Sequence, residues 1–214
     1  MKKNVFFPTV LLALFSTALF SCSDDSNDDP SNGEENTSSV KTRAEAEALA
    51  NAVYGPLQTL SSSYTFLVES ATETTISFEE VDDSKDGPQV SVFETTPSNW
   101  YPIKVFNRLY KSIGAANLAI EEIGTATSNS NLTDADKALL VARAKFVRGY
   151  SYFQLVQLFG EVPLVLTSKS TERTRASIDV VYDQVVNDLT EALPNLPAFD
   201  SNKSNPTQNA VNTI

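Results

Sequence analysis

The sequence predicts an all-α fold built from helical hairpins, and three features carry this prediction. Apolar residues recur every three or four positions in four stretches between residues 42 and 193, which is the spacing of amphipathic helices. Each stretch opens at a capping residue or a proline and closes at a glycine or a proline. The segment between the second and third stretches is short and polar, so these two helices should pack as an antiparallel hairpin.

The first predicted helix starts at a capping box, in which Thr42 caps the first turn and Glu45 reaches back. Gly55-Pro56 should end or bend it. Residues 57–97 are rich in Ser, Thr and acids, with β-branched patches at 74–78 and 89–93. The turn signal Asp86-Gly87-Pro88 lies between these patches. We therefore predict an irregular excursion that contains one short β-hairpin.

The second predicted helix runs from Pro102 to Ile123, with Pro102 in the first helical position and Gly124 closing it. The third starts after the N-cap Thr133 and ends at Phe159, before Gly160. Its expected apolar stripe is Ala135, Leu139, Ala142, Phe146, Tyr150, Phe153 and Val156. We expect Arg148 to pair with a carboxylate of a neighbouring helix, with a solvated side chain as the alternative. Asn117, beside the stripe of the second helix, should bond backbone of the adjacent hairpin.

The fourth predicted helix starts after Ser177 and is stopped by Pro194; its apolar stripe is Val181, Val185, Leu189 and Ala192. Between the third and fourth helices, Pro163 forces residues 161–166 into an extended segment. Thr207–Ile214 resembles the opening of a fifth helix. Stacked hairpins of this kind suggest a tetratricopeptide-like arrangement, although the spacing is not a clean 34-residue repeat.

The N-terminus has the pattern of a lipoprotein signal. Lys2 and Lys3 precede an apolar run of 16 residues, shorter than the ~20 that span a membrane. The run ends in Leu19-Phe20-Ser21-Cys22, which resembles a bacterial lipobox. We expect residues 1–21 to be a cleaved signal and Cys22, the single cysteine, to carry a lipid. The alternative is an incidental thiol in an ordinary signal peptide.

Residues 22–40 are expected to be an acidic, disordered tether. Six acids and no base lie between Cys22 and Asn36, and such a stretch cannot bury a core. Acids that directly follow the cysteine also resemble the surface-export signal of Bacteroidetes lipoproteins, and a plain solvated linker is the alternative. The remaining residues, 41–214, are enough for one domain.

Composition argues against several classes of function. The chain has no histidine, which excludes Ser-His-Asp and Cys-His catalysis and histidine-ligated zinc. Its net charge is −11, which argues against nucleic acid as a partner. We find no glycine-rich phosphate loop and expect no cofactor, no metal site and no enzyme. A glycosidase carboxylate pair has no fixed sequence spacing, so that alternative stays open.

Two segments carry a resemblance to a known family. They are Leu109-Tyr110-Lys111-Ser112-Ile113 with Ala116-Asn117, and the long stretch from Ala142 to Leu164 that contains Arg148-Gly149-Tyr150 and Phe159-Gly160-Glu161-Val162-Pro163. Both are similar to the SusD/RagB family of Bacteroidetes outer-membrane lipoproteins. The resemblance implies an outward-facing, lipid-anchored protein of the outer membrane. Such a protein binds glycans, is not an enzyme, and forms the lid of a SusC-like TonB-dependent transporter. Members are more than twice as long, so residues 41–214 would be the N-terminal part of a SusD-like fold, incomplete at the C-terminus.

Sugar binding needs aromatic faces and polar groups for hydroxyls. Trp100, the single tryptophan, lies between Asn99 and Tyr101, and these three residues are the first candidates for a glycan site. Tyr64, beside Phe66, is the second. Packing at the start of the second helix is the alternative role of Trp100. The alternative functions are a protein-interaction module that docks on the transporter, and a truncated remnant that binds no ligand.

Overall fold

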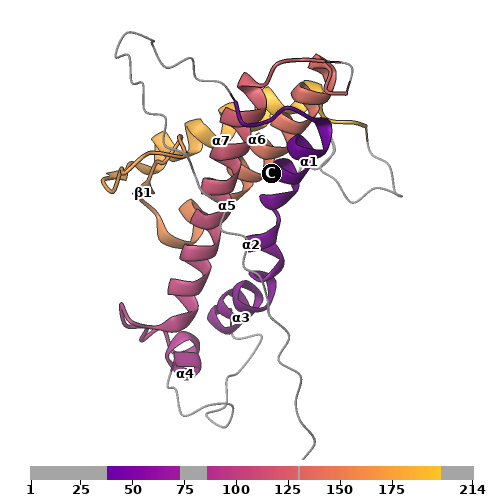
Figure 1. The fold of residues 1–214 in the computed structure, drawn as a ribbon. Coiled ribbons are helices and arrows are strands. Elements are labelled where there is room, and N and C mark those ends of the chain that lie inside the picture. Colours follow the sequence, from indigo (N-terminus) through magenta and orange to yellow (C-terminus); the bar gives the residue numbers. More distant parts are fainter. Residues whose placement is uncertain (1–37, 73–85, 130, 199–214) are drawn as a thin grey trace, which may run out of the picture. The chain divides into compact units, whose positions relative to one another are not determined.

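The computed structural model describes residues 38–72, 86–129 and 131–198, all within one compact unit that spans Asn36–Ile214 (Figure 1). Its helices are α1 (Arg43–Ala52), α2 (Gly55–Gln58), α3 (Ser61–Ala71), α4 (Asp86–Ser91), α5 (Trp100–Thr125), α6 (Asp134–Phe159) and α7 (Ile178–Ala192), which is followed by a 3₁₀ turn, η2 (Leu193–Asn195). Strand β1 (Val162–Pro163) pairs antiparallel with β2 (Arg175–Ala176), Val162 opposite Ala176. The all-α fold class is confirmed. The predicted signal, most of the tether and the predicted helix Thr207–Ile214 lie outside the described residues.

The start signals of α1 and α6 are confirmed, whereas the predicted start of α5 at Pro102 is wrong. Thr42 and Glu45 form the predicted capping box, and Thr133 caps α6 in a second box with Asp136. α5 begins at Trp100, two residues before the predicted start, and Asn99 caps it. Pro102 is therefore the third helical residue. The first N–H groups of a helix have no intrahelical acceptor, so the missing N–H of this proline costs no helical hydrogen bond. Within the described residues, every helix is too short or too polar to cross a lipid bilayer.

The prediction for residues 57–97 is wrong where the structure describes them. Ser61–Ala71 forms helix α3, and Gln89 lies in α4 rather than in a strand. Leu60, Tyr64 and Leu67 recur at helical spacing and pack on the core beside α5. This packing outweighs the weak helix propensity of serine and threonine. The other predicted strand, residues 74–78, lies outside the described residues.

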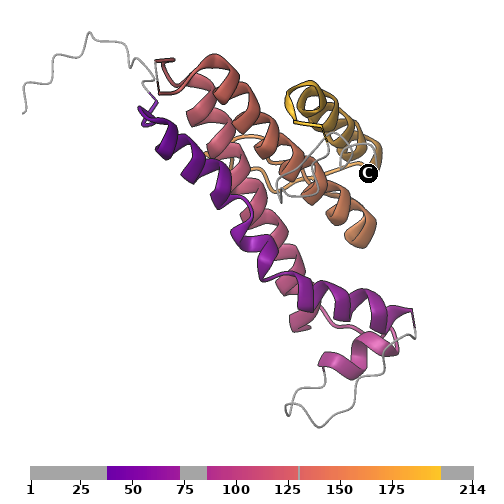
Figure 2. The same ribbon diagram turned by 90° about the vertical axis from the view of Figure 1, so that its right-hand side faces the viewer.

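Helices α5 and α6 form the central antiparallel pair, as predicted, with α1 packed on both and α7 packed on α6 (Figure 2). Leu109 and Ile113 of α5 and Tyr152 and Leu155 of α6 are fully buried between these elements. The predicted stripe of α7 is confirmed, since its four residues are all buried.

The predicted stripe of α6 is only partly right. Ala142 and Val156 are buried, whereas Phe146, Tyr150 and Phe153 are half-buried and Ala135 is exposed. The buried positions also include Leu140, Ala144, Val147, Ser151 and Leu155. Because α6 packs against α5 on one side and α7 on another, burial spreads around the helix instead of following one stripe.

A buried ion pair joins α6 to α7. Arg148 donates from Nε to Asp188 Oδ2 at 2.8 Å and from Nη2 to Asp188 Oδ1 at 2.6 Å. The side chains are 8% and 0% exposed. The remaining nitrogen, Nη1, donates to Asn117 Oδ1 of α5 at 2.9 Å and to the Leu166 carbonyl at 3.3 Å. Asn117 Nδ2 donates to the Val165 carbonyl at 2.9 Å. The predicted roles of Arg148 and Asn117 are therefore confirmed.

The same network fixes the extended segment that follows α6. Gly160, with a φ of 68°, turns the chain out of the helix in a conformation that glycine adopts without strain. The Tyr152 hydroxyl then donates to the Val165 carbonyl at 2.9 Å and accepts the Val165 N–H at 2.7 Å. Tyr110 Oη donates to the Pro163 carbonyl at 2.6 Å. Side chains thus satisfy backbone groups that a longer sheet would otherwise pair.

Removing Arg148 should strongly destabilise the fold. Arg148→Ala leaves Asp188 buried without its partner, and we expect a loss of about 3–5 kcal/mol in the free energy of unfolding. The control is Lys145→Ala, which removes the more exposed pair with Glu191 and should cost about 0–1 kcal/mol. Urea unfolding measures both. Equal losses in the two variants would contradict the central role of the Arg148–Asp188 pair.

Stability should fall at alkaline pH. Burial raises the pKa of Tyr152 from 10.0 to about 12. As the pH rises, the Tyr152 hydroxyl therefore loses its proton at a lower pH in the unfolded chain than in the folded one. The contribution of Tyr152 is therefore complete below pH 10 and is lost between pH 10 and 12. Tyr152→Phe should be less stable at neutral pH, because the Val165 N–H loses its partner and the Val165 carbonyl keeps only Asn117. Its stability should nevertheless fall less steeply over this range. Identical slopes in urea unfolding across these pH values would rule this account out.

Candidate functional site

Two adjoining cavities form a groove along α5, which we call the α5 groove. The first cavity, about 490 Å³, lies beside the first two turns of α5. The second, about 290 Å³, lies one turn further along. Phe106 and Asn107 line both cavities, so the two form one continuous depression. Residues of α5 form one wall, and the end of α6 with residues 163–175 provides the other.

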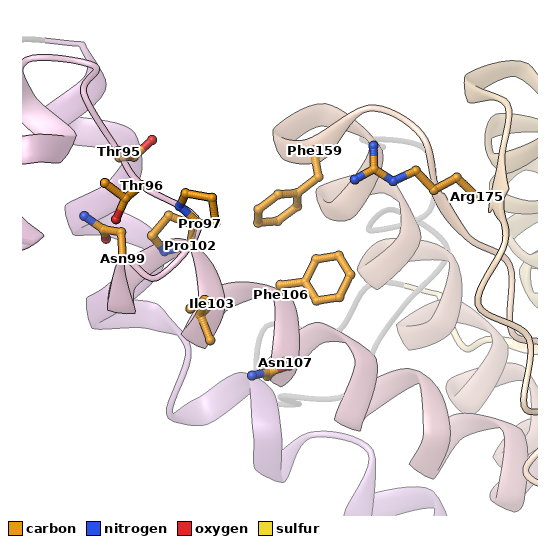
Figure 3. A pocket seen from close by; sticks show the side chains of 10 residues that line it. All are labelled: Thr95, Thr96, Pro97, Asn99, Pro102, Ile103, Phe106, Asn107, Phe159 and Arg175. Atoms are coloured by element: carbon orange, nitrogen blue, oxygen red, sulfur yellow. The ribbon is translucent and has the colours of Figure 1, made fainter.

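Aromatic rings form the floor of the first cavity. The rings of Phe106 and Phe159 meet edge to face, with centroids 5.3 Å apart. Figure 3 shows Arg175 reaching from β2 toward Phe159, with Asn107 on the α5 side. The other lining residues are Thr95, Thr96, Pro97, Asn99, Pro102 and Ile103. An apolar floor with a few polar groups at its edge is the usual composition of a site for a small molecule.

The second cavity has fixed walls. Tyr110 lines it beside Pro163 and Val165, and the hydrogen bond from Tyr110 to the Pro163 carbonyl holds the two walls together. Arg173 and Glu172 complete the lining. The backbone N–H groups of Thr174 and Arg173 donate to the Glu172 carboxylate and lower its pKa. This carboxylate is therefore ionised and occupied by the backbone.

An apolar cavity of about 440 Å³ adjoins the first one and shares Thr95, Pro102 and Phe159 with it. Its other lining residues are Leu67, Val68, Thr72, Val90, Phe93 and Leu158. Phe93 is 70% exposed and has a φ of 58°. A bulky residue rarely adopts this left-handed conformation, which costs of order 1–3 kcal/mol. Strain of this kind is found more often at binding sites than elsewhere.

Trp100, the first candidate from the sequence, is the first residue of α5 and is 49% exposed. The Nζ atom of Lys104 lies 4.0 Å from its ring centroid, which is a cation–π contact. Tyr101 meets Trp100 edge to face at 5.0 Å and stacks on Phe66 at 4.3 Å. Residues three and seven positions apart share one helix face, so Trp100 lies on the side of α5 that carries Ile103 and Asn107, although it lines neither cavity of the α5 groove.

Asn99 is fully buried and works as the cap of α5. Its Oδ1 accepts the Tyr101 N–H at 3.1 Å, and its Nδ2 donates to the Asp86 carbonyl at 2.9 Å and to Gln89 Oε1 at 3.2 Å. The hydrogen bonds of the Asn99 amide therefore connect α4 to the start of α5.

Tyr64, the other predicted glycan-site residue, is bonded to α6 rather than to Trp100. Tyr64 is half-buried, and its hydroxyl donates to Gln154 of α6, whereas Phe66 of the same helix reaches Tyr101. Cys22 lies outside the described residues. Phe106, Phe159 and Arg175, which line the first cavity, were not predicted as site residues. One signal in the sequence pointed to this region: no acidic residue occurs between Glu94 and Glu121 in a chain with 27 acids.

A further cavity, about 460 Å³, lies at the other end of α5. Its two glutamates hold neighbouring chain segments. Glu122 Oε2 accepts the N–H and the hydroxyl of Ser39, each at 2.8 Å, and Glu121 Oε1 accepts the Ser168 N–H at 2.8 Å. Across the described residues, no group of three or more Asp, Glu, Cys or His side chains is arranged to hold a metal ion.

Comparison with protein families places the chain clearly. The SusD-like family model described as "Starch-binding associating with outer membrane" matches residues 29–214. The curated SusD-like protein P2 of Formosa agariphila is 27% identical over 125 residues, which are 56% of this chain and 24% of that protein.

Solved structures share the fold at low sequence identity. A laminarin-binding SusD-like protein has a TM-score of 0.66 and 23% identity, over 80% of this chain and 38% of that one. A SusD superfamily protein from Bacteroides vulgatus has a TM-score of 0.68 and 19% identity over the same shares. A structure solved with a xylogluco-oligosaccharide has a TM-score of 0.62 and 20% identity, over 78% of this chain and 32% of that one.

The chain thus spans about a quarter of the length of its curated relative and between 32% and 38% of the lengths of these structures. Within that span, the match to the family model covers most of the sequence, including both segments that carried the resemblance. The chain belongs to the SusD-like family.

Proposed function

We propose that this chain binds carbohydrate along the α5 groove. The observation that carries the proposal is the exposed ring of Trp100 beside a groove floored by Phe106 and Phe159. Two solved structures of the same fold support it, because one is of a laminarin-binding SusD-like protein and the other was solved with a xylogluco-oligosaccharide.

The groove offers the two kinds of contact that a sugar needs. Sugar rings present C–H faces that pack on aromatic rings, and Trp100 and Phe106 supply such rings on successive turns of α5. Sugar hydroxyls need hydrogen-bond donors and acceptors, which the exposed Asn107 and the hydroxyls of Thr95 and Thr96 provide. Trp100 and Asn107 lie about 10 Å apart along the helix axis, which favours an oligosaccharide over a single sugar.

The wider role proposed is that of a nutrient-binding lipoprotein on the outside of the outer membrane. Cys22 would carry the lipid, and a SusC-like TonB-dependent transporter would be the partner. Supporting this are the Leu19-Phe20-Ser21-Cys22 sequence and the description of the matching family. We propose no catalytic step, since the chain has no histidine and its relatives are named for binding.

Ligand binding should change the fluorescence of the protein, because Trp100 is the single tryptophan. Titration with laminarin and xyloglucan oligosaccharides, and with acidic glycans, should shift or quench its emission. In calorimetry, Trp100→Ala should weaken binding by about 1–2 kcal/mol, or roughly 5- to 30-fold. The matched control is Tyr182→Ala, an exposed aromatic residue of α7, which should bind as the unchanged protein does.

Unchanged affinity in Trp100→Ala would remove Trp100 from the site. If no glycan binds while the chain co-purifies with a transporter, the interaction-module alternative replaces this proposal.

The lipid anchor has a direct test. The chain should be extracted from membranes of the cell that produces it, and its N-terminal peptide analysed by mass spectrometry. We expect this peptide to begin at Cys22 with acyl groups attached. A free Cys22 thiol, or a peptide that begins upstream of it, would exclude the lipoprotein role.

A further inference from the structure

We infer that the glycan bound in the α5 groove is anionic, a polysaccharide whose carboxylate or sulfate groups lie on Arg173 and Arg175. This inference rests on the proposed carbohydrate binding and names the class of carbohydrate. Its starting point is the distribution of charge around the groove.

The charge on the α5 side of the groove is opposite in sign to that of the whole chain. The chain has a net charge of −11, yet residues 95–120 contain Lys104, Arg108 and Lys111 and no acid. Lys104, Asn107 and Lys111 follow Trp100 at helical spacing and share one face of α5. This stretch of α5 is thus basic, with its charges beside the residues that line the two cavities rather than among them.

The opposite wall contributes two arginines, both exposed and two positions apart. Arg175 lines the first cavity and Arg173 lines the second. Because Phe106 and Asn107 line both cavities, the two guanidinium groups lie along one continuous depression.

Among the described residues, neither arginine forms a close ion pair, although Arg173 lowers the pKa of its neighbour Glu172 by electrostatic attraction. Arg43, Lys137, Lys145 and Arg148 each form an ion pair, whereas no ion pair of Arg173 or Arg175 occurs in the described part of the chain. Arg173 uses one nitrogen, Nη1, on the Glu172 carbonyl at 2.7 Å, and the Glu172 carboxylate is held by backbone N–H groups.

An unpaired guanidinium beside an apolar floor favours an anion over a neutral hydroxyl. Its planar set of N–H donors matches carboxylate and sulfate oxygens in pairs. The rings of Phe106 and Phe159 line the same cavity as Arg175 and offer an apolar surface to the sugar ring that would carry the anion. The net negative charge of the chain repels polyanions at long range. Affinity for an anionic glycan would therefore have to come from local contacts in the α5 groove.

Calorimetry on the purified chain tests the inference with two matched pairs of probes. Polygalacturonate is compared with its carboxyl-reduced, neutral form, and a sulfated galactan with its desulfated form. We expect the anionic member of at least one pair to bind roughly tenfold or more tighter, and added salt to weaken it. The pair that shows the difference identifies carboxylate or sulfate as the recognised group.

The variants are Arg173→Gln, Arg175→Gln and the double change. The double variant should lose roughly tenfold or more in affinity for the anionic glycan and keep its affinity for the neutral form. Arg175→Lys, which retains the charge but not the planar donor set, should fall between the unchanged chain and Arg175→Gln. Lys145→Gln, which removes a charge that lines none of the cavities described above, should bind as the unchanged chain does; circular dichroism checks the fold of each variant.

Two results would overturn the inference, and they differ in what they leave standing. If neutral glycans bind as tightly as their anionic counterparts, or the double variant keeps its affinity for the anionic glycan, carbohydrate binding stands and the anionic class does not. If no glycan binds and the Trp100 emission never changes, carbohydrate binding itself fails.

Discussion

The buried pair between Arg148 and Asp188 is the interaction on which the rest of the structure depends. It joins α6 to α7, and the remaining donor of the arginine reaches Asn117 of α5 and the backbone after α6. The close approach of α6 and α7 needs Gly149, because a Cβ atom at that position would lie 3.3 Å from the Cβ of Asp188. Burying two charges costs desolvation energy that their attraction only partly offsets. The contribution of the pair is therefore geometric, since one set of directed bonds fixes the mutual positions of three helices and an extended segment.

That extended segment connects the core to the α5 groove. The bonds from Tyr110 and Tyr152 hold residues 162–166 against the helices, and β1 in turn pairs with β2, which presents Arg175. The width of the groove is thus set by buried side chains that do not line its first cavity. A change at Tyr152 can alter the groove without touching a bound ligand.

The sequence predicted those elements whose signals are local. The capping boxes at Thr42 and Thr133 and the apolar period of α7 located helices to within one or two residues. α3 was missed because its residues favour helix only once they pack against α5.

The same distinction between local and distant signals applies to the residues of the candidate site. An exposed Trp100 beside a helix start could be predicted, but the α5 groove could not, since Phe159 and Arg175 reach it from elements distant in sequence. Asn99 was predicted as a site residue beside Trp100. It is instead buried as the cap of α5, through contacts with α4 that no local pattern reveals.

The bonds from Ser39 to Glu122 fix the point where the N-terminal segment joins the helices. Glu122 is 22 residues from Trp100 along α5, or about 33 Å. Ser38 is 16 positions after Cys22, a length of chain that reaches at most ~55 Å. If Cys22 is held in a membrane, the tether joins the helices at the end of α5 opposite to Trp100. The length of α5 therefore separates the ring of Trp100 from the place where the N-terminal segment meets the helices.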